Sequence, residues 1–241
     1  THSATANIKG YWRNNGLSTW TDLKGSNNGT PTSVTETILI PQGVDSTRDA
    51  QGFIMNRARN TSSANMPSGD SKIECRLFKD IISNGASTAS IECWMKADGT
   101  EGSAQYATLV GERTGKNILL CRSSNTSKAA AIYTTSTTGN NNALISTTAN
   151  VFDNNWHHIA FTFGDGDGVG RLYIDGSEED TDTKTGETLF MGADTFFVGG
   201  GDDQQDRSFN GTVDGVLVYS DALDSTEILR NYNATKGNHR N

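Results

Sequence analysis

Two adjacent histidines, His157 and His158, are the first residues of this 241-residue chain that suggest chemistry. An imidazole can act as a general base near neutral pH and can bind a metal ion. Both histidines lie in the alternating segment 156–163, which predicts a strand, so their side chains point to opposite faces. They therefore cannot bind one metal ion together in regular geometry. His157 shares its parity with Ile159 and Phe161, and we expect it to be a core histidine with its hydrogen bonds satisfied.

Carboxylates offer a second chemistry, glycoside hydrolysis, which needs two of them on either side of the scissile bond, roughly 5–9 Å apart. The densest acidic run, residues 178–182, follows the turn Asp175-Gly176 and lacks apolar partners. We interpret this run as a solvated acidic loop. The sequence contains neither a Gly-x-Ser-x-Gly motif nor a His-Glu-x-x-His motif. We therefore expect no catalytic residues and no enzymatic activity.

Charge and hydropathy exclude two kinds of partner. The formal net charge is −8, and no run of Lys or Arg is long enough to follow a phosphate backbone, so we expect no nucleic-acid binding. No segment approaches the roughly 20 apolar residues of a membrane span, and no signal-like apolar region follows the N-terminus. We expect no membrane insertion. Because the chain begins with Thr1, we expect a processed or trimmed product, or part of a longer protein.

The cysteines are an odd and sparse set of three: Cys75, Cys93 and Cys121. Such a set is not a disulfide framework. Cys75 and Cys93 follow similar Ile-Glu dipeptides, and Ile and Cys would share one strand face. We interpret them as buried small hydrophobes, with one disulfide and a spare thiol as the alternative.

The remaining pattern is that of a protein rich in short strands. Only 34% of residues are hydrophobic, and the chain has 26 Gly and 3 Pro. Alternating or apolar segments recur at about the 8–12-residue spacing of a β-sandwich. The predicted strands are an entry strand at 11–12, then 38–40, 53–55, 72–78, 89–96, 107–111, 117–122, 129–134, 143–146, 157–163, 171–175, 196–199 and 213–219.

One helix is predicted, near the C-terminus. Asp224 can cap it, and Glu227 stands three residues later as in a capping box. Ile228, Leu229 and Tyr232 form an apolar stripe along this helix.

In this order, the segments resemble the laminin-G-like branch of the concanavalin A-like sandwich superfamily. The similar parts are the aromatic strand and polar loop of 11–30, Trp-His-His-Ile-Ala at 156–160, Leu-Tyr-Ile-Asp-Gly at 172–176 and the C-terminal part from 209 to 232. The resemblance implies an all-β fold, a jelly-roll β-sandwich of two antiparallel sheets with one short C-terminal helix. We place this domain at 11–235, with an N-terminal arm at 1–10 and a frayed tail at 236–241.

The same resemblance implies a calcium site, because laminin-G-like domains often bind Ca²⁺ at a rim of loops. Ca²⁺ prefers several oxygen ligands, which loops rich in Asp and Gly supply. Asp202 and Asp203, with Asp206 nearby, are the first candidates for ligands. Asp165 and Asp167 are the second. A hydrated acidic turn is the alternative at either place.

A second resemblance concerns the N-terminal part. Residues 11–16, 37–43 and 48–53 look like segments of virion proteins of marine tailed phages, which often carry a laminin-G-like module. It implies a non-catalytic structural or adhesion module at the virion surface, in capsid decoration or a fibre. Other virion proteins and glycans would then be partners, and the chain could form a homo-oligomer. The alternatives are an extracellular calcium-dependent lectin outside any virus and, third, a glycoside hydrolase on this fold.

Overall fold

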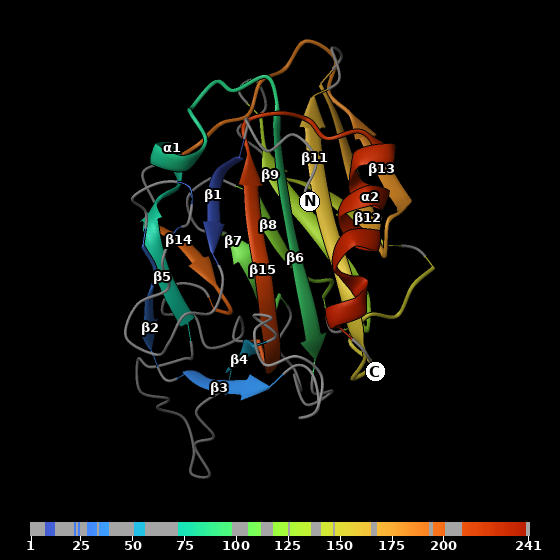
Figure 1. Cartoon of the computed structure of the whole chain (residues 1–241). Coiled ribbons are helices and arrows are strands. Elements are labelled where there is room, and N and C mark those ends of the chain that lie inside the picture. The colour runs from blue at the N-terminus through green and yellow to red at the C-terminus, as the bar shows by residue number, and fades with distance from the viewer. Residues whose placement is uncertain are drawn as a thin grey trace.

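The computed structural model describes the chain at residues 8–12, 22, 24, 28–32, 34–38, 51–55, 72–97, 106–111, 118–124, 126–135, 141–146, 148–164, 168–192, 195–200 and 209–239. Over these residues the strands form two sheets that face each other (Figure 1). Every pairing between neighbouring strands that the structure describes is antiparallel. The predicted two-sheet jelly-roll sandwich is therefore confirmed.

The first sheet has eight described strands, and β1 (Ile8–Trp12) pairs with β15 beside its main path. The main path runs β13 (Ser177–Thr183), β12 (Val169–Ile174), β11 (Trp156–Gly164), β6 (Ala89–Ala97), β15 (Gly211–Tyr219), β4 (Gln51–Met55) and β3 (Val34–Ile38). Strand β1 starts before the boundary at residue 10 that the sequence placed between arm and domain. Ile8 is buried in the sheet's outer layer, which explains the difference.

The second sheet has seven described strands. Their order is β10 (Asn141–Ile145), β9 (Ala129–Thr134), β8 (Ile118–Arg122), β7 (Thr108–Gly111), β14 (Thr195–Val198), β5 (Lys72–Leu77) and β2 (Thr30–Thr32). A four-residue helix, α1 (Phe78–Ile81), follows β5.

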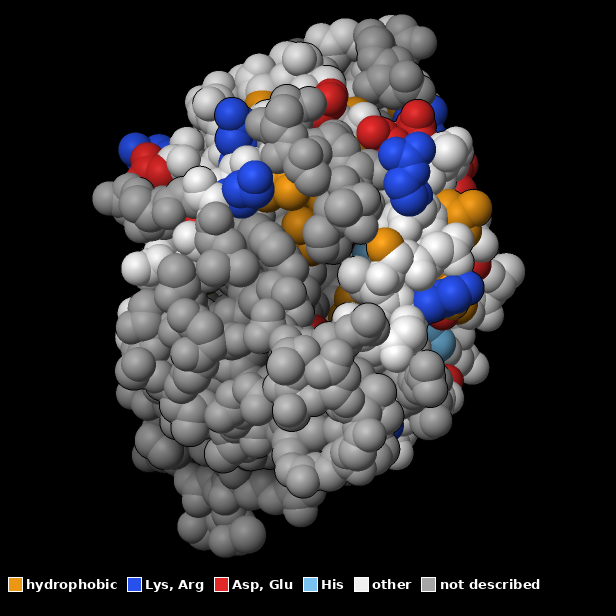
Figure 2. Space-filling view, viewed as in Figure 1, with side chains coloured by type: hydrophobic (Ala, Val, Ile, Leu, Met, Phe, Trp, Pro, Cys, Tyr) orange, Lys and Arg blue, Asp and Glu red, His pale blue; other side chains and the backbone are white. Residues whose placement is uncertain are grey.

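Helix α2 (Ser225–Thr235) covers the outer face of the eight-stranded sheet, beside β11 and β12 (Figure 1). The predicted capping box is present, because the Asp224 side chain accepts from the Glu227 backbone N–H and the Glu227 side chain accepts from the Asp224 N–H. Ile228 is buried against the sheet, whereas Leu229 is 45% exposed. Over α2 the surface mixes Lys and Arg with Asp and Glu side chains, and neither sign dominates (Figure 2).

We expect Asp224→Ala to lower the free energy of unfolding by about 1 kcal/mol, because the variant loses the side-chain acceptor that satisfies the Glu227 N–H. Asp224→Asn keeps an acceptor of equal capping strength and should cost a few tenths of a kcal/mol at most. Urea unfolding of the two variants measures the difference. Equal stabilities of the two variants would contradict this role.

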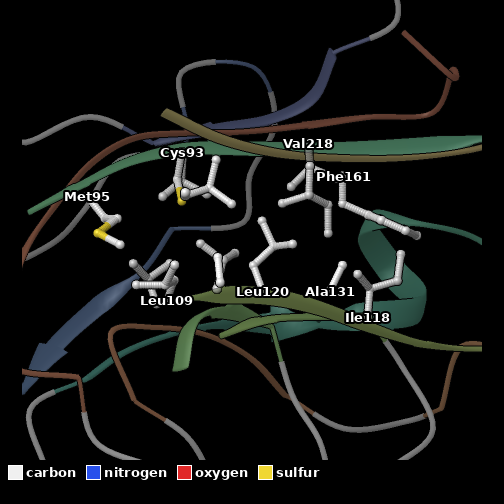
Figure 3. Close-up of a cluster of buried hydrophobic side chains, with 14 of the residues drawn as sticks. Cys93, Met95, Leu109, Ile118, Leu120, Ala131, Phe161 and Val218 are labelled. Carbon is white, nitrogen blue, oxygen red and sulfur yellow. The ribbon is translucent and has the colours of Figure 1, made fainter. Parts of the chain in front are cut away.

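The core lies between the sheets (Figure 3). Cys93 and Met95 of β6, Phe161 of β11 and Val218 of β15 point from one sheet toward Leu120 of β8 in the other. Alternation along each strand places these residues on a single face. The other face of β6 is also buried, because α2 covers it.

In the hairpin of β11 and β12 the side chains alternate between the two faces as predicted. Residues 178–182, which follow this hairpin, do not form the predicted loop. Asp175 and Gly176 both have positive φ, 52° and 83°, as the tight hairpin turn between β12 and β13 requires. The chain therefore turns straight back, and residues 177–183 pair with β12 as the edge strand β13. The interpretation of 178–182 as a solvated acidic loop is wrong. Charged side chains are compatible with a strand at the sheet edge, where most of this one is at least partly exposed.

All three cysteines are free thiols, which confirms the first interpretation over a disulfide. Cys93 and Cys121 are fully buried, and Cys75 is half-buried. Burial in the core, with a smaller contribution from Glu92, raises the pKa of the Cys93 thiol far above its ordinary value. Cys93 therefore acts as a small apolar residue.

No helix that the structure describes combines the length and the apolar character needed to cross a lipid bilayer.

Candidate functional site

A polar network lies buried between α2 and the eight-stranded sheet. The Glu92 carboxylate, 1% exposed, accepts from the Tyr219 hydroxyl at 2.8 Å and from Asn231 Nδ2 at 3.0 Å. His158 Nε2 lies 3.4 Å from the other Glu92 oxygen. Groups from two central strands and the helix thus meet at one carboxylate. Buried hydrogen bonds of this kind, made between the helix and the sheet, fix the position of the helix on the sheet.

The C-terminal segment is held on the same face. Helix η3 (Lys236–Asn238) follows α2, and the His239 ring stacks on Trp94 at a centroid distance of 4.2 Å and an interplanar angle of 8°. His239 Nε2 lies 3.0 Å from the buried carboxylate of Asp214. The structure therefore differs from the frayed tail expected from residue 236 onward, since stacking and hydrogen bonding order the chain as far as His239. Residues 240 and 241 lie outside the described residues.

His157 is half-buried at the end of the sandwich, so its interpretation as a core histidine is wrong. Its Nδ1 lies 2.8 Å from Asp175 Oδ2, and its Nε2 lies 3.2 Å from Asp153 Oδ1. The second oxygen of Asp175 accepts from the His158 backbone N–H at 2.8 Å. Parity fixes the face of a residue but not its depth, and His157 is the second residue of its strand. His157 and the two carboxylates join β11 to the turn that follows β12.

This cluster predicts a specific pH dependence. Burial by itself would lower the pKa of His157, but hydrogen bonds and charges from Asp175 and Asp153 raise it above the ordinary 6.5. The protonated ring therefore stabilises the fold fully below about pH 6.5, and this contribution is lost as the pH rises through the raised value. Burial by itself would raise the pKa of Asp153, but hydrogen bonds from Asn155 and the charge of His157 lower it below 3.8. The contribution of Asp153 is therefore present above its ordinary pKa and is lost only at strongly acidic pH.

We expect His157→Gln to destabilise the chain most between about pH 4 and 6.5, with a smaller loss above neutral pH. Urea unfolding of both proteins from pH 4 to 9 measures the difference. A loss that grows toward alkaline pH would contradict the assignment of a protonated His157.

A pocket of about 290 Å³ opens where the start of α2 meets the edge of the eight-stranded sheet. Strands β12 and β13 and the start of α2 supply its lining: Arg171, Tyr173, Glu178, Ala222, Leu223, Asp224 and Ser225. We call this site the α2 pocket. Its volume is at the lower end of the range of roughly 300–1,000 Å³ for small-molecule sites.

Hydrogen bonds orient the polar groups of the α2 pocket. The Tyr173 side chain is 1% exposed, and its hydroxyl bonds with Thr162 and Glu178. Burial and the charge of Glu178 raise the pKa of Tyr173 to about 12, so the hydroxyl keeps its proton. Because a carboxylate only accepts, Tyr173 donates to Glu178. Arg171 Nε lies 3.5 Å from the same carboxylate. Glu178 is thus a positioned acceptor at the wall of the pocket.

The two carboxylates of the α2 pocket already have roles within the protein. The Asp224 carboxylate is exposed and caps α2, and the Glu178 carboxylate is 42% exposed and paired with Arg171. Both carboxylates have further lone pairs that can accept hydrogen bonds from a ligand.

The proposed calcium ligands cannot be placed. Asp202, Asp203 and Asp206, and the second candidates Asp165 and Asp167, lie outside the described residues. Within the part of the chain that the structure describes, no group of three or more His, Cys, Asp or Glu residues is arranged to hold a metal ion. The calcium site stays a prediction.

The pocket residues were missed in the sequence because no local pattern joins them. Arg171 and Glu178 come from a hairpin whose second strand was interpreted as a loop, and Asp224 was interpreted only as a helix cap. The Asp175-Gly176 turn was the available signal, since a two-residue turn brings residues 171 and 178 to neighbouring strands.

Comparison with solved structures shows relatives of the fold. The binding domain of Paraclostridial Mosquitocidal Protein 1 has a TM-score of 0.70 at 16% identity, covering 95% of this chain and 52% of that one. The receptor-binding domain of botulinum neurotoxin D has a TM-score of 0.62 at 16% identity, covering 95% of this chain and 53% of that one. The ligand-binding domain of botulinum neurotoxin serotype D, in complex with N-acetylneuraminic acid, has a TM-score of 0.62 at 16% identity. The match covers 96% of this chain and 53% of that one. The chain spans about half the length of these proteins, and at such identities the likeness concerns the fold alone.

No curated protein is significantly similar to the chain. The model of the Laminin_G_3 family, described as the concanavalin A-like lectin/glucanases superfamily, matches residues 68–229. The match runs from just before β5 into α2 and so includes most of both sheets and every residue of the α2 pocket. This chain belongs to the Laminin_G_3 family of the concanavalin A-like lectin/glucanases superfamily.

Proposed function

We propose that this chain is a non-catalytic carbohydrate-binding module whose site is the α2 pocket. The observation that carries the proposal is the composition of that pocket, in which carboxylate, guanidinium and hydroxyl groups converge on a space of about 290 Å³. This volume suits a single sugar ring better than a long oligosaccharide. Membership of a superfamily that contains lectins and glucanases supports a sugar as ligand.

The chemistry of the lining matches that of a pyranose. Sugar hydroxyls both donate and accept, so they need acceptors such as Glu178 and Asp224 and donors such as Arg171 on the protein. One solved relative of this fold is described in complex with N-acetylneuraminic acid. Since this chain spans about half of that protein, the sugar supports the general class of ligand only.

A glycan array tests the proposal with three proteins. The unmodified chain should bind a set of glycans, and Glu178→Ala should bind them about tenfold or more weakly, because a charged hydrogen-bond acceptor is lost. Glu179→Ala is the matched control, since Glu179 contacts Ser146 and Thr148 instead of lining the α2 pocket. Failure of the unmodified chain to bind any neutral or acidic glycan would overturn the proposal.

The non-catalytic part of the proposal has its own test. Glycans that bind should be recovered intact after prolonged incubation, because one pocket carboxylate is paired with Arg171 and the other caps α2. Mass spectrometry of the recovered glycans checks this. Release of new reducing ends by the unmodified chain, lost in Glu178→Gln or Asp224→Asn, would establish a glycoside hydrolase instead.

We propose in addition that the module is displayed on a phage particle, as capsid decoration or in a fibre, in contact with other virion proteins. The resemblance of residues 11–16, 37–43 and 48–53 to segments of virion proteins supports this. Purified particles should contain the chain at a fixed ratio to the main capsid protein. Absence from particles, with the chain free in the medium, would favour an extracellular lectin.

Ca²⁺ binding by Asp202, Asp203 and Asp206 is also a proposal, supported by the oxygen ligands that these residues supply. Titration calorimetry with Ca²⁺ should give binding that is lost in the triple Asn variant. No heat of binding in the unmodified chain would refute the site. Glycan binding that persists in EDTA would show that the α2 pocket acts without the ion.

A further inference from the structure

We infer that the α2 pocket selects neutral sugars and discriminates against acidic ones such as uronic and sialic acids. This inference rests on the proposed function and names the class of sugar that the same site takes. It follows from the balance of charge in the pocket and from the partners that its groups already have.

The lining of the α2 pocket carries more negative than positive charge. Glu178 and Asp224 contribute two carboxylates, and Arg171 contributes one guanidinium. A ligand carboxylate placed among them would meet a net charge of the same sign. Like charges about 4 Å apart repel by roughly 1 kcal/mol even at the dielectric constant of water, which corresponds to about fivefold in affinity.

Arg171, the one cation among the described residues of the lining, is already paired. Arg171 Nε lies 3.5 Å from Glu178 Oε2, and the Tyr173 hydroxyl also donates to this carboxylate. An acidic sugar would have to compete with Glu178 for the guanidinium. A neutral sugar hydroxyl can bond to either group without separating the pair, because a carboxylate has about four acceptor sites.

The start of α2 does not supply an anion site either. The N-terminus of a helix attracts anions through its free N–H groups and its dipole. Here the Asp224 carboxylate occupies that position and accepts from the Glu227 N–H at 2.8 Å. The Glu227 carboxylate in turn accepts from the Asp224 N–H at 3.2 Å. Two protein carboxylates therefore hold the place that a ligand anion would need.

Neutral sugars fit the same groups well. Each hydroxyl of a pyranose can donate to a carboxylate oxygen, and hydrogen bonds to charged acceptors are about twice as strong as neutral ones. Glu178 and Asp224 lie on two different elements around the pocket, so neighbouring hydroxyls of one ring can donate to both. The arrangement thus favours a ring with adjacent free hydroxyls and no carboxylate.

Matched pairs of ligands test the inference. Methyl glucoside, galactoside and mannoside are each compared with the corresponding methyl uronide, which replaces only the CH₂OH group by a carboxylate. Binding to the ¹⁵N-labelled full chain at pH 7 is followed by NMR. The neutral member of at least one pair should bind about fivefold or more tightly than its uronide. The shifted amide signals should include those of Arg171, Ala222 and Ser225.

The variant Glu178→Gln tests the effect of the negative charge alone, because glutamine keeps the shape of the side chain and one oxygen that accepts hydrogen bonds. It should weaken binding of the neutral glycoside about fivefold and should reduce or abolish the preference over the uronide. Asp224→Asn should shift the preference in the same direction while keeping the cap. Glu179→Gln, the matched control, should leave the preference unchanged.

Two results would overturn the inference while the proposed function stands: uronides that bind as tightly as their neutral partners, or neutral sugars that shift only amides away from the α2 pocket. A chain that binds no member of any pair and no glycan on the array would overturn both.

Discussion

We expect replacement of Glu92 by alanine to lower the free energy of unfolding by about 3–5 kcal/mol, among the largest effects of any single substitution in this chain. The carboxylate is 1% exposed and accepts from Tyr219 and Asn231, with His158 Nε2 at 3.4 Å. Alanine would remove the charged acceptor of these buried donors, at a cost of about 1–3 kcal/mol for each lost bond. His158 is affected most, because its Nδ1 has no hydrogen-bond partner within the described residues.

Glu92→Gln is the control for shape. It keeps one acceptor oxygen toward Tyr219 and loses the charge, so it should be less destabilising than alanine. Urea unfolding monitored by tryptophan fluorescence measures both variants, because Trp94 lies on the same face of the sheet, against His158 and Tyr232. A loss below about 1 kcal/mol for Glu92→Ala would show that the buried network contributes little.

The second large effect is expected at Gly211, the first residue of β15. It pairs with Ala97 of β6 on one side and Met55 of β4 on the other, and its φ is 151°. A Cβ here would overlap the Lys96 carbonyl oxygen and lie 2.9 Å from the Ala97 Cα. Both are backbone atoms of a central strand, so they cannot move aside as a flexible side chain does. We expect Gly211→Ala to destabilise the fold by about 3 kcal/mol or more.

Gly237→Ala is the matched control for this substitution. A Cβ at Gly237 meets no atom within 4 Å, and its φ is not positive. The midpoint of thermal unfolding should fall sharply for Gly211→Ala and stay within about a degree or two of the unmodified chain for Gly237→Ala. Equal midpoints for the two variants would mean that β15 can shift at its start, against the structure.

Local pattern was sufficient to predict much of the fold. The alternation at 156–163 predicted the faces of residues 157–163 of β11, and Asp224 with Glu227 predicted the start of α2 and its capping box. Both features depend on only a few neighbouring residues. Strand alternation fixes the face of each side chain, and the unsatisfied N–H groups at a helix start favour a capping carboxylate. The burial of Cys93 followed in the same way from strand context, whereas Cys75 is only half-buried.

Contacts between distant segments were beyond these rules. The acidic run 178–182 has the composition of a loop, but the turn at Asp175-Gly176 places it beside β12 as a strand. His239 belongs to a polar C-terminal segment that predicts a tail, but in the fold it stacks on Trp94 of a distant strand. Glu92 sits on the outer face of β6, which pattern alone assigns to solvent, and α2 buries it. The α2 pocket combines residues about 50 positions apart, so no spacing in the sequence could reveal it.

Membership of the superfamily leaves the chemistry open, since both lectins and glucanases share this architecture. What separates them is the state of the carboxylates at the ligand. In the α2 pocket one carboxylate caps a helix and the other pairs with an arginine. In both roles the carboxylate oxygens face hydrogen-bond donors of the protein, which suits groups that accept hydrogen bonds from a ligand.

The most direct test of the central claim is a crystal structure of the unmodified chain with its strongest neutral glycan from the array. One intact sugar ring is expected in the α2 pocket, with hydroxyls bonded to Glu178 and Asp224. A ring bound at another surface, an empty α2 pocket beside it, or a cleaved product would contradict the proposed site and its non-catalytic role.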